Sequence, residues 1–363
     1  MKEGASWAAQ LNRPDALSCD VDLNDVDALA LDLRSSAEPK KTVMFARTDD
    51  DVILAWGLIS SRTWNEDERS LSLAAGGVWS TFFGSTIIAP ASARTVPLIV
   101  NDVDGYPIVN PVLDTSLSGF SLGTIGKKLV EQRLAWPGAP AVFDLPADEI
   151  GTRERAYLFS GMKTVGSALT DLTNVENGPD FAFDAQRASN GLGLRYVMRH
   201  GSEATPRIGT DVGVWSLGEQ SPITGLVVDD DAADLASAAW LTAGKQAGAA
   251  LISRTLNDAL VAAGYPPLDI VDTSRNDVSV QATLDAYGAE LIGLASRPQR
   301  ELSFSVRAAA SPGLGQYRPG DTVTIDVPSD HPYIAASIPV RITSVSGDEA
   351  GLSVKIGCVI LDA

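Results

Sequence analysis

The stretch from residue 52 to residue 83 constrains the fold most, because it alternates like a strand and carries three tryptophans, at positions 56, 64 and 79. Alternate positions from Ile53 to Ile59 are apolar, and the positions between them are apolar too. A charged turn at 65–68 separates this run from a second alternating run. The pattern predicts a β-hairpin whose first strand, Val52 to Trp64, is covered on both faces. A barrel or sandwich of the same chain would cover it, and so would a subunit interface.

The charge of the chain limits the ligands that it is suited to bind. Its 363 residues include 46 acidic and 28 basic residues, which gives a formal net charge of -18. Because nucleic-acid affinity comes largely from Lys and Arg that neutralise phosphates, this balance argues against a surface that grips DNA or RNA. The acidic charge fits a surface to which DNA must not adhere. It fits equally well a protein whose negative charge serves only to keep it soluble.

The cysteines and the start of the chain bear on the compartment. Cys19 and Cys358 lie in apolar, strand-like segments near opposite ends. This favours two buried free thiols over a disulfide framework, with a bridge between the two as the alternative. The first residues lack the apolar core of a signal peptide, and no run reaches the ~18 apolar residues of a spanning helix. We therefore expect a soluble protein, made in the cytoplasm, with no membrane-spanning segment.

The order of strand and helix patterns predicts an α+β protein that is mainly β. Short alternating strands fill residues 15–100, and a turn-rich polar segment follows at 101–120. Apolar residues at helical spacing then recur in 121–134 and in 163–174, before strand character returns near residue 194. At this length two or more domains are expected, and residues 121–175 form an α-containing insertion between β segments.

A second β module follows from about residue 210. Its first strand, ITGLVVDD, precedes a short Ala-rich segment that we expect to be helical, and four more strands lie near the C-terminus. Helices are predicted around 255–264 and 278–295, while 246–254 fits a helix or a strand. The plan of strands, helical insertion and strands thus occurs twice, without a visible sequence repeat.

Enzyme motifs are mostly missing from the sequence. A metal cluster or catalytic triad based on histidine would have to use His200 or His331, and neither has a nucleophile elbow or an HExxH pattern nearby. We expect both to be loop or strand-end residues. The segment 121–128 resembles a phosphate-binding loop, but Ser121 and Lys128 stand where that motif needs Gly and Ser or Thr. A helix start is the better interpretation.

Three acidic clusters, at 49–51, 66–68 and 229–231, are candidates for holding a hard cation. None has the alternating spacing and closing Glu of an EF-hand loop, so solvated turns are favoured. Residues 316–321 have Pro and Gly at positions that favour a turn feeding a strand. The sequence therefore offers no catalytic, cofactor-binding or metal-binding residue.

Several stretches, in this order along the chain, together resemble the minor tail proteins of siphophages that infect actinobacteria, of the tail-tip or baseplate hub family. They are ILAWGLISSRTWNEDERSLSLAAGGVWSTFF, LTDLTNVENGPDFAF with LRYVMRHG, LVAAGYPPLDIV with VQATLDAYGAEL, and GQYRPGDTVTI with VRITSVSG. The resemblance implies two tail-tube-like β-barrel domains with smaller α-containing insertions. It places the first barrel at 1–110 plus 190–220 and its insertion at 111–189. The second barrel is placed at 221–250 plus 300–363, with a helical insertion at 251–299.

The resemblance also implies a structural, non-enzymatic role in the virion. Three subunits would form a ring that caps or adapts the distal end of the tail tube and gives DNA a channel. Implied partners are the distal tail protein ring, the tail tube, the tape-measure protein and other tail-tip or fibre proteins, while DNA passes without specific binding. Part of the acidic charge would line the channel. Trp56 would be the anchor across the ring, with a core tryptophan as the equal alternative. Since the sequence ends soon after its last strand, we expect a hub core.

Two other classes of function stay open. One is a hydrolase of cell-wall polysaccharide or peptide that uses carboxylates, which no pattern identifies among so many acidic residues. The other is a glycan-binding adhesin at the tail tip. Zymography against host cell walls and a glycan pull-down would separate them from the hub.

Overall fold

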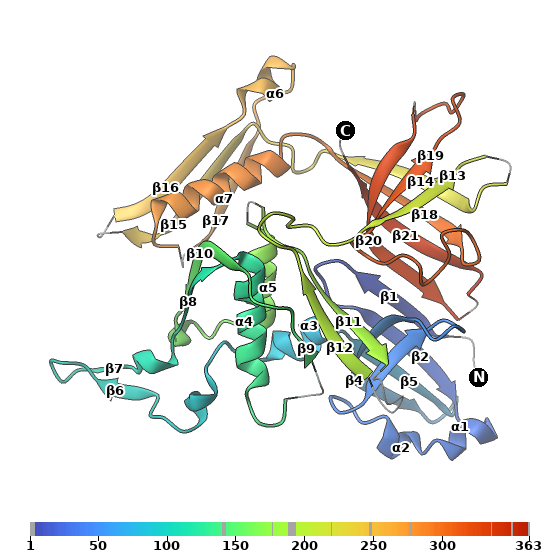
Figure 1. Ribbon diagram of the computed structural model, residues 1–363, viewed down its shortest axis with the longest axis horizontal. Helices are drawn as coiled ribbons and strands as arrows, with labels where there is room; N and C mark the ends of the chain where they lie inside the picture. Colours follow the sequence, from blue (N-terminus) through green and yellow to red (C-terminus); the bar gives the residue numbers. More distant parts are fainter. Residues whose placement is uncertain are drawn as a thin grey trace. The chain divides into compact units, whose positions relative to one another are not determined.

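The computed structural model describes residues 4–139, 143–175, 177–187, 194–218, 220–246, 249–275, 278–334, 336–349 and 351–361. The fold is mainly β with a few helices, as predicted (Figure 1). The chain forms two compact units: unit 1 comprises 1–173, 179–226 and 303–363, and unit 2 comprises 174–178 and 227–302. None of the described helices is long and apolar enough to cross a membrane.

An eleven-stranded sheet is the largest element of the fold, and its order is β14-β18-β21-β20-β1-β2-β5-β4-β3, with β19 pairing β20 and β13 pairing β19. It joins strands from both ends of the chain, because β1 pairs antiparallel with β20 as well as with β2. The strands are β1 Ser6–Gln10, β2 Ala16–Asp22, β3 Val43–Arg47, β4 Ile53–Asn65, β5 Ser70–Gly76, β13 Asp211–Ser216, β14 Ile223–Asp231, β18 Gln299–Arg307, β19 Thr322–Asp326, β20 Ile338–Asp348 and β21 Ser353–Ile360.

The predicted hairpin is confirmed as β4 and β5, joined by a turn at 66–69. Residues 55–59 of β4 are buried on both faces, whereas 60–65 are largely exposed and Trp64 keeps 45% of its surface. Gly57 lets the two strands approach closely, because a Cβ on it would lie 2.2 Å from the carbonyl oxygen of Gly76. The cover over 55–59 comes from the same chain, not from a neighbouring subunit.

The insertion lies in the sequence between strand β5 and strand β13 of the large sheet, and it also belongs to unit 1. Helix α4 begins where Ser121 accepts a hydrogen bond from the Thr124 N–H, so the helix start predicted there is confirmed. The apolar stripes predicted for α4 and α5 are buried. The insertion comprises β6 Ile99–Asn101, β7 Pro107–Val109, β8 Thr115–Phe120, α4 Leu122–Leu134, β9 Phe143–Asp144, β10 Ile150–Tyr157, α5 Val165–Thr173, β11 Phe181–Arg187 and β12 Leu194–His200.

Short helices complete the first part of unit 1. They are α1 Val26–Ala30, α2 Leu33–Ser36 and α3 Val78–Thr81, with 3-10 turns at Phe83–Ser85, Ala91–Arg94, Pro111–Leu113 and Phe159–Gly161. The segment predicted as a polar loop at 101–120 contains strands β7 and β8. Sequence reasoning missed these strands because Gly, Pro and Asp, which are unfavourable in strands, make up seven of the twenty residues.

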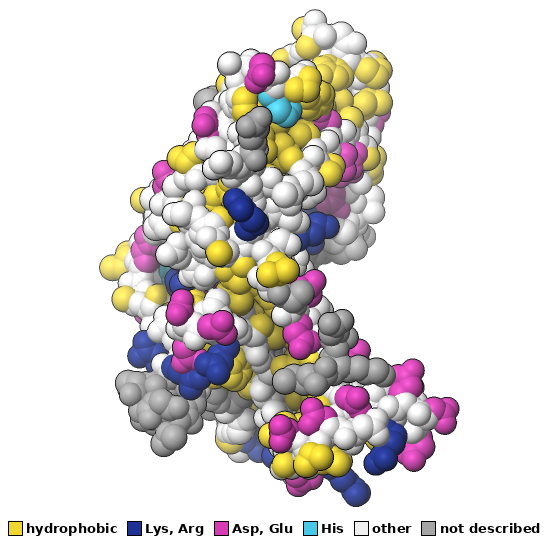
Figure 2. Space-filling view, turned by 90° about the vertical axis from the view of Figure 1, so that its right-hand side faces the viewer, with side chains coloured by type: hydrophobic (Ala, Val, Ile, Leu, Met, Phe, Trp, Pro, Cys, Tyr) yellow, Lys and Arg dark blue, Asp and Glu magenta, His cyan; other side chains and the backbone are white. Residues whose placement is uncertain are grey.

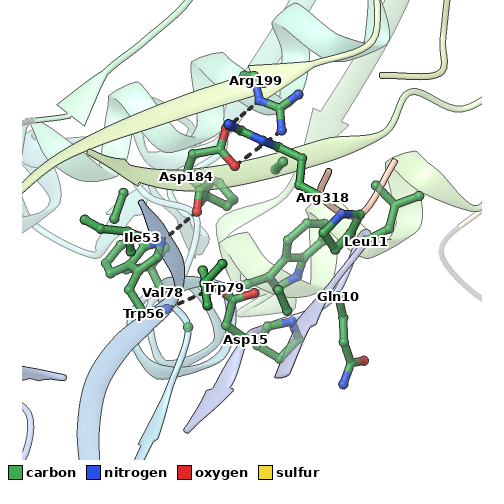
Figure 3. A pocket seen from close by; sticks show the side chains of 18 of the residues that line it. Gln10, Leu11, Asp15, Ile53, Trp56, Val78, Trp79, Asp184, Arg199 and Arg318 are labelled. Atoms are coloured by element: carbon green, nitrogen blue, oxygen red, sulfur yellow. Dashed lines mark hydrogen bonds and ion pairs between the residues drawn. The ribbon is translucent and has the colours of Figure 1, made fainter. Parts of the chain in front are cut away.

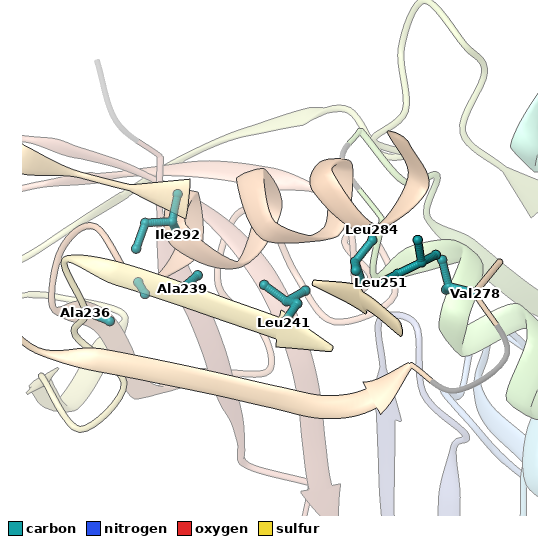
Figure 4. Packing of buried hydrophobic residues seen from close by; sticks show 8 residues of the cluster. Ala236, Ala239, Leu241, Leu251, Val278, Leu284 and Ile292 are labelled. Carbon is teal, nitrogen blue, oxygen red and sulfur yellow. The ribbon is translucent and has the colours of Figure 1, made fainter. Parts of the chain in front are cut away.

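Unit 2 is a three-stranded sheet, ordered β16-β15-β17, with helix α7 packed on one face (Figure 4). Its core includes Leu241 and Leu251 from the sheet and Leu284 and Ile292 from α7. The ambiguous segment 246–254 contributes strand β16, and the predicted helices are confirmed as α6 and α7. The elements are β15 Ala238–Gln246, β16 Ala249–Leu256, α6 Asp258–Ala262, β17 Asp269–Arg275 and α7 Gln281–Leu294.

Two further expectations differ from the structure. The Ala-rich segment after β14 is not helical: at 232–237 it turns, and the Ala233 N–H is bonded to the Asp231 carboxylate. The two predicted barrels are not confirmed, because no sheet among the described residues closes on itself and one open sheet runs through both β modules. The predicted domain boundaries stay a prediction, and the one at 189/190 lies outside the described residues.

Candidate functional site

A pocket of about 250 Å³ opens in unit 1 between the large sheet and the β11–β12 pair (Figure 3). The β1–β2 loop, the start of β4, the start of α3, strand β11 and the turn before β19 all line it. Segments from five regions of the chain meet here. Its side chains include Asp15, Trp56, Trp79, Asp184 and Arg318.

Trp56 forms one wall of the pocket and belongs to the core of its own chain. It is 3% exposed, and its indole Nε1–H donates to the Phe183 carbonyl oxygen at 2.7 Å. Its ring stacks on Tyr196 with centroids 4.0 Å apart and planes 20° from parallel. The prediction that Trp56 anchors a contact across the ring is therefore wrong, because β11 and β12 already use the side chain.

Asp15 is the carboxyl group of the pocket that lacks a cationic partner. Its Oδ2 accepts the Trp56 backbone N–H at 3.3 Å, and among the described residues no Lys or Arg forms an ion pair with it. Desolvation by the surrounding protein raises the pKa of Asp15 to about 8, against smaller opposing effects of backbone hydrogen bonds from Trp56 and Gln10. The side chain is half-buried, so a molecule in the pocket can still reach it. Asp15 is therefore mostly uncharged at neutral pH.

The other two carboxylates of the pocket are held by arginines. Asp184 of β11 receives two hydrogen bonds from Arg199, at 2.5 and 3.3 Å, and one from Arg318 at 3.4 Å. Asp51 is bound by Arg187 and by Arg47, and the hydrogen bonds from these two guanidinium groups lower the pKa of Asp51. Both carboxylates are thus paired with guanidinium groups.

A buried ion pair beneath the pocket ties the insertion to both groups of sheet strands. Asp180 is 0% exposed and pairs with Arg341 of β20, which is 8% exposed. Its carboxylate also accepts the Ile208 N–H at 3.0 Å and the Asn12 amide at 2.8 Å, and it pairs with Arg207 at 3.4 Å. Segments near residues 12, 180, 208 and 341 are fixed by this one carboxylate.

Neither histidine belongs to a catalytic cluster. His200 ends β12, as predicted, with Nδ1 2.8 Å from the Gly201 carbonyl oxygen. His331 lies in a turn and accepts the N–H groups of Tyr333 and Ile334. Among the described residues no three His, Cys, Asp or Glu side chains gather as metal ligands would.

The remaining sequence candidates are structural. Cys19 and Cys358 are free, as favoured, although only Cys358 is fully buried. The acidic clusters at 49–51 and 66–68 lie in turns, but 229–231 is the end of strand β14, so the predicted turn there is wrong. The turn at 316–321 is confirmed and leads into β19.

Sequence reasoning missed Asp15, Asp180 and Arg341. No motif surrounds them, and their partners lie between 21 and 168 residues away in the chain. The weak signal available was an Asp directly after Pro in both NRPD and NGPD, where a turn carries a carboxylate into the fold.

Comparison of the sequence with models of protein families and with curated proteins finds no match. Two solved structures share the fold over nearly its full length. The tail protein from Neisseria meningitidis MC58 has a TM-score of 0.59 at 15% identity and covers 99% of this chain and 91% of that one. The 43 kDa tail protein of prophage MuSo2 from Shewanella oneidensis has a TM-score of 0.57 at 11% identity, with 98% and 94% covered. The chain therefore has the fold of phage tail proteins, as the sequence resemblance predicted.

Proposed function

We propose that this protein is a structural component of a phage or prophage virion: a trimeric tail-tip (baseplate) hub that caps or adapts the distal end of the tail tube. The observation that carries the proposal is the similarity of fold, over nearly the whole chain, to two tail proteins. In this proposal the protein is made in the host cytoplasm, has no catalytic role and reaches the tail tip by assembly. The β segments at 1–110 with 190–220, and at 221–250 with 300–363, are its two tube-like modules.

The large sheet offers a way to build a ring. It is open, with β3 at one end of the order and β14 at the other. Strand β3, VMFAR, is apolar, and Phe45 on it is 39% exposed. An exposed apolar edge strand is a template for pairing with another chain. Pairing of the β3 edge with a different edge of the next copy would be a heterologous contact, which closes into a ring when its rotation allows.

The partners follow from such a ring. It would contact the distal tail protein ring, the tail tube and the tape-measure protein, with other tail-tip or fibre proteins attached, and DNA would pass through its channel without specific binding. The net charge of -18 suits a channel that repels phosphates. On the face shown in Figure 2, Asp and Glu side chains are scattered among other residues. A ring with a basic or neutral lumen would contradict this part of the proposal.

The mass of the protein in solution tests the hub. Light scattering after size exclusion should give about three times the chain mass of 38.1 kDa, and electron microscopy should show rings. Phe45→Lys should shift the protein toward monomer, because a charge on an edge strand blocks pairing. Leu31→Lys is the matched control, since Leu31 is 61% exposed and lies outside β3. A persistent monomer that binds no other tail protein would contradict the hub.

One observation favours a second candidate, a carboxylate-based hydrolase of cell walls. The pocket places Asp184 near Asp15, whose pKa is raised to about 8, and general acid catalysis needs a carboxyl group that keeps its proton at neutral pH. The two arginines on Asp184 argue against its acting as a base. Zymography decides: a cleared band that Asp15→Asn abolishes would support the hydrolase, and an unchanged band or none would exclude this pocket.

A further inference from the structure

Positive charge is concentrated in the pocket beside Asp15, in a chain that is strongly acidic overall. Four arginines line the pocket against three aspartates, and one of the three, Asp15, is mostly uncharged at neutral pH. The pocket then carries about two positive charges in a protein of net charge -18. Its charged groups are Arg13 and Asp15 of the β1–β2 loop, Asp51 before β4, Asp184 and Arg187 of β11, Arg199 of β12 and Arg318 before β19.

The hydrogen-bond donors of the pocket also exceed its acceptors. Each guanidinium has five N–H groups. Arg318 makes one bond, to Asp184 at 3.4 Å, and among the described residues Arg13 makes none. Arg13 and Arg318 are exposed, so their free donors are open to solvent and to a ligand. An uncharged Asp15 adds an O–H donor deeper in the pocket (Figure 3).

We propose that this pocket binds a carboxylate side chain presented by a neighbouring copy of the protein. A planar carboxylate matches the two-pronged guanidinium group and accepts the Asp15 O–H as well. Phosphate offers similar acceptors, but the overall acidity of the chain repels the polyanionic backbone of nucleic acid. A second copy, by contrast, brings 46 acidic residues of its own. The choice of a neighbouring copy rests on the proposed ring, whereas the anion-binding pocket does not.

Binding of a small carboxylate tests the pocket directly. Indole N–H signals of Trp56 and Trp79, which line the pocket, would be followed by NMR during titration with N-acetylglutamic acid amide. The uncharged N-acetylglutamine amide and inorganic phosphate serve as comparison ligands. We expect saturable shifts with the glutamate derivative only. Absent shifts, equal shifts with the glutamine derivative, or tighter binding of phosphate would overturn the proposal.

Variants separate the pocket from general charge effects. Arg318→Gln should weaken binding at least tenfold, whereas Arg94→Gln, at an exposed arginine outside the pocket, should not change it. Asp15→Asn keeps an N–H donor but cannot ionise, so it should bind at pH 7 like the parent protein. Equal losses in Arg94→Gln and Arg318→Gln would overturn the assignment of the site.

The pH dependence gives the sharpest readout. Above pH 8 Asp15 loses its donor and gains a negative charge, so affinity should fall about tenfold between pH 7 and pH 9. This fall should vanish in Asp15→Asn, and a fall that persists there would contradict the role of Asp15. Light scattering in the same samples identifies the source of the carboxylate. If Arg318→Gln leaves the trimer intact, or if the unmutated protein stays monomeric and still binds the ligand, the neighbouring copy is overturned as that source.

Discussion

Replacing Asp180 with Asn tests whether one buried carboxylate holds the insertion and both groups of sheet strands together. Asp180 is fully buried, and Arg341 opposite it is 8% exposed. Asp180→Asn preserves the shape but leaves the Arg341 guanidinium without its counter-charge. Among the described residues, the other partners of Arg341 are the carbonyl oxygens of Gly320 and Ile208, both at 3.1 Å. Removing one partner of such a pair costs about 3–5 kcal/mol of the free energy of unfolding.

A double-mutant cycle isolates the pair. Arg341→Met should cost a similar amount, and the double variant should be about 1–3 kcal/mol more stable than the sum of the single losses predicts. The control is Asp144→Asn, because Asp144 and Arg195 form an exposed pair at 2.8 Å, with side chains 41% and 46% exposed. That control should lose less than about 1 kcal/mol.

Urea unfolding followed by tryptophan fluorescence measures these losses of stability in unit 1, which contains the substituted residues. Six of the seven tryptophans lie in unit 1, and Trp240 alone lies in unit 2. Strictly additive losses for Asp180→Asn and Arg341→Met, or a loss for Asp180→Asn no larger than that of Asp144→Asn, would refute the reasoning.

Three further predictions concern single side chains. Trp56→Ala should lower the free energy of unfolding by about 3–5 kcal/mol, because the indole is buried and hydrogen-bonded. Trp64→Ala, at a site 45% exposed, should lower it by under about 1 kcal/mol in the same urea assay. Asp15 has a pKa of about 8 in the folded protein, above its value in the unfolded chain. The folded protein therefore binds an extra proton between about pH 4 and 8. The free energy of unfolding falls as pH rises through that window, by up to about 5 kcal/mol. Asp15→Asn should remove this slope in urea titrations at pH 5, 7 and 9, and a slope equal to that of the parent would contradict it. A thiol reagent should modify Cys19 in the folded protein and Cys358 only after unfolding, while a single titratable thiol, or none, in urea without reductant would reveal a disulfide.

Local pattern was sufficient to predict most elements of the fold. Alternation located the β4–β5 hairpin, and helical spacing located α4, α5 and α7, because each helix buries residues at helical spacing and β5 buries apolar residues at alternate positions. Prediction failed where the period is absent, as in β8, and where alanine content suggested a helix at 232–237 although an Asp side chain caps a turn there. The pairing of β1 with β20 could not be predicted, since it joins residues more than 330 positions apart.

The pocket could not be predicted for a similar reason. Its chemistry depends on which arginines lie opposite Asp184 and on the absence of one opposite Asp15, and both facts follow from tertiary contacts between distant segments. Composition even pointed away from it, because a net charge of -18 gives no hint of a local positive site. Only the position of Asp15 directly after a Pro in a turn was visible in the sequence.

The burial of Trp56 changes where a ring contact must be sought. Hot spots of interfaces are usually exposed aromatic or Arg side chains that become buried on assembly. Trp56 cannot act in this way, since its ring and its indole N–H are already used within the chain. Two other features of the chain could form a ring contact. One is the apolar edge strand β3, whose backbone pairing needs no tryptophan. The other is the pocket, whose arginines have unused hydrogen-bond donors in an acidic chain. In the proposed ring, a second copy would pair with the β3 edge and supply a carboxylate to the pocket.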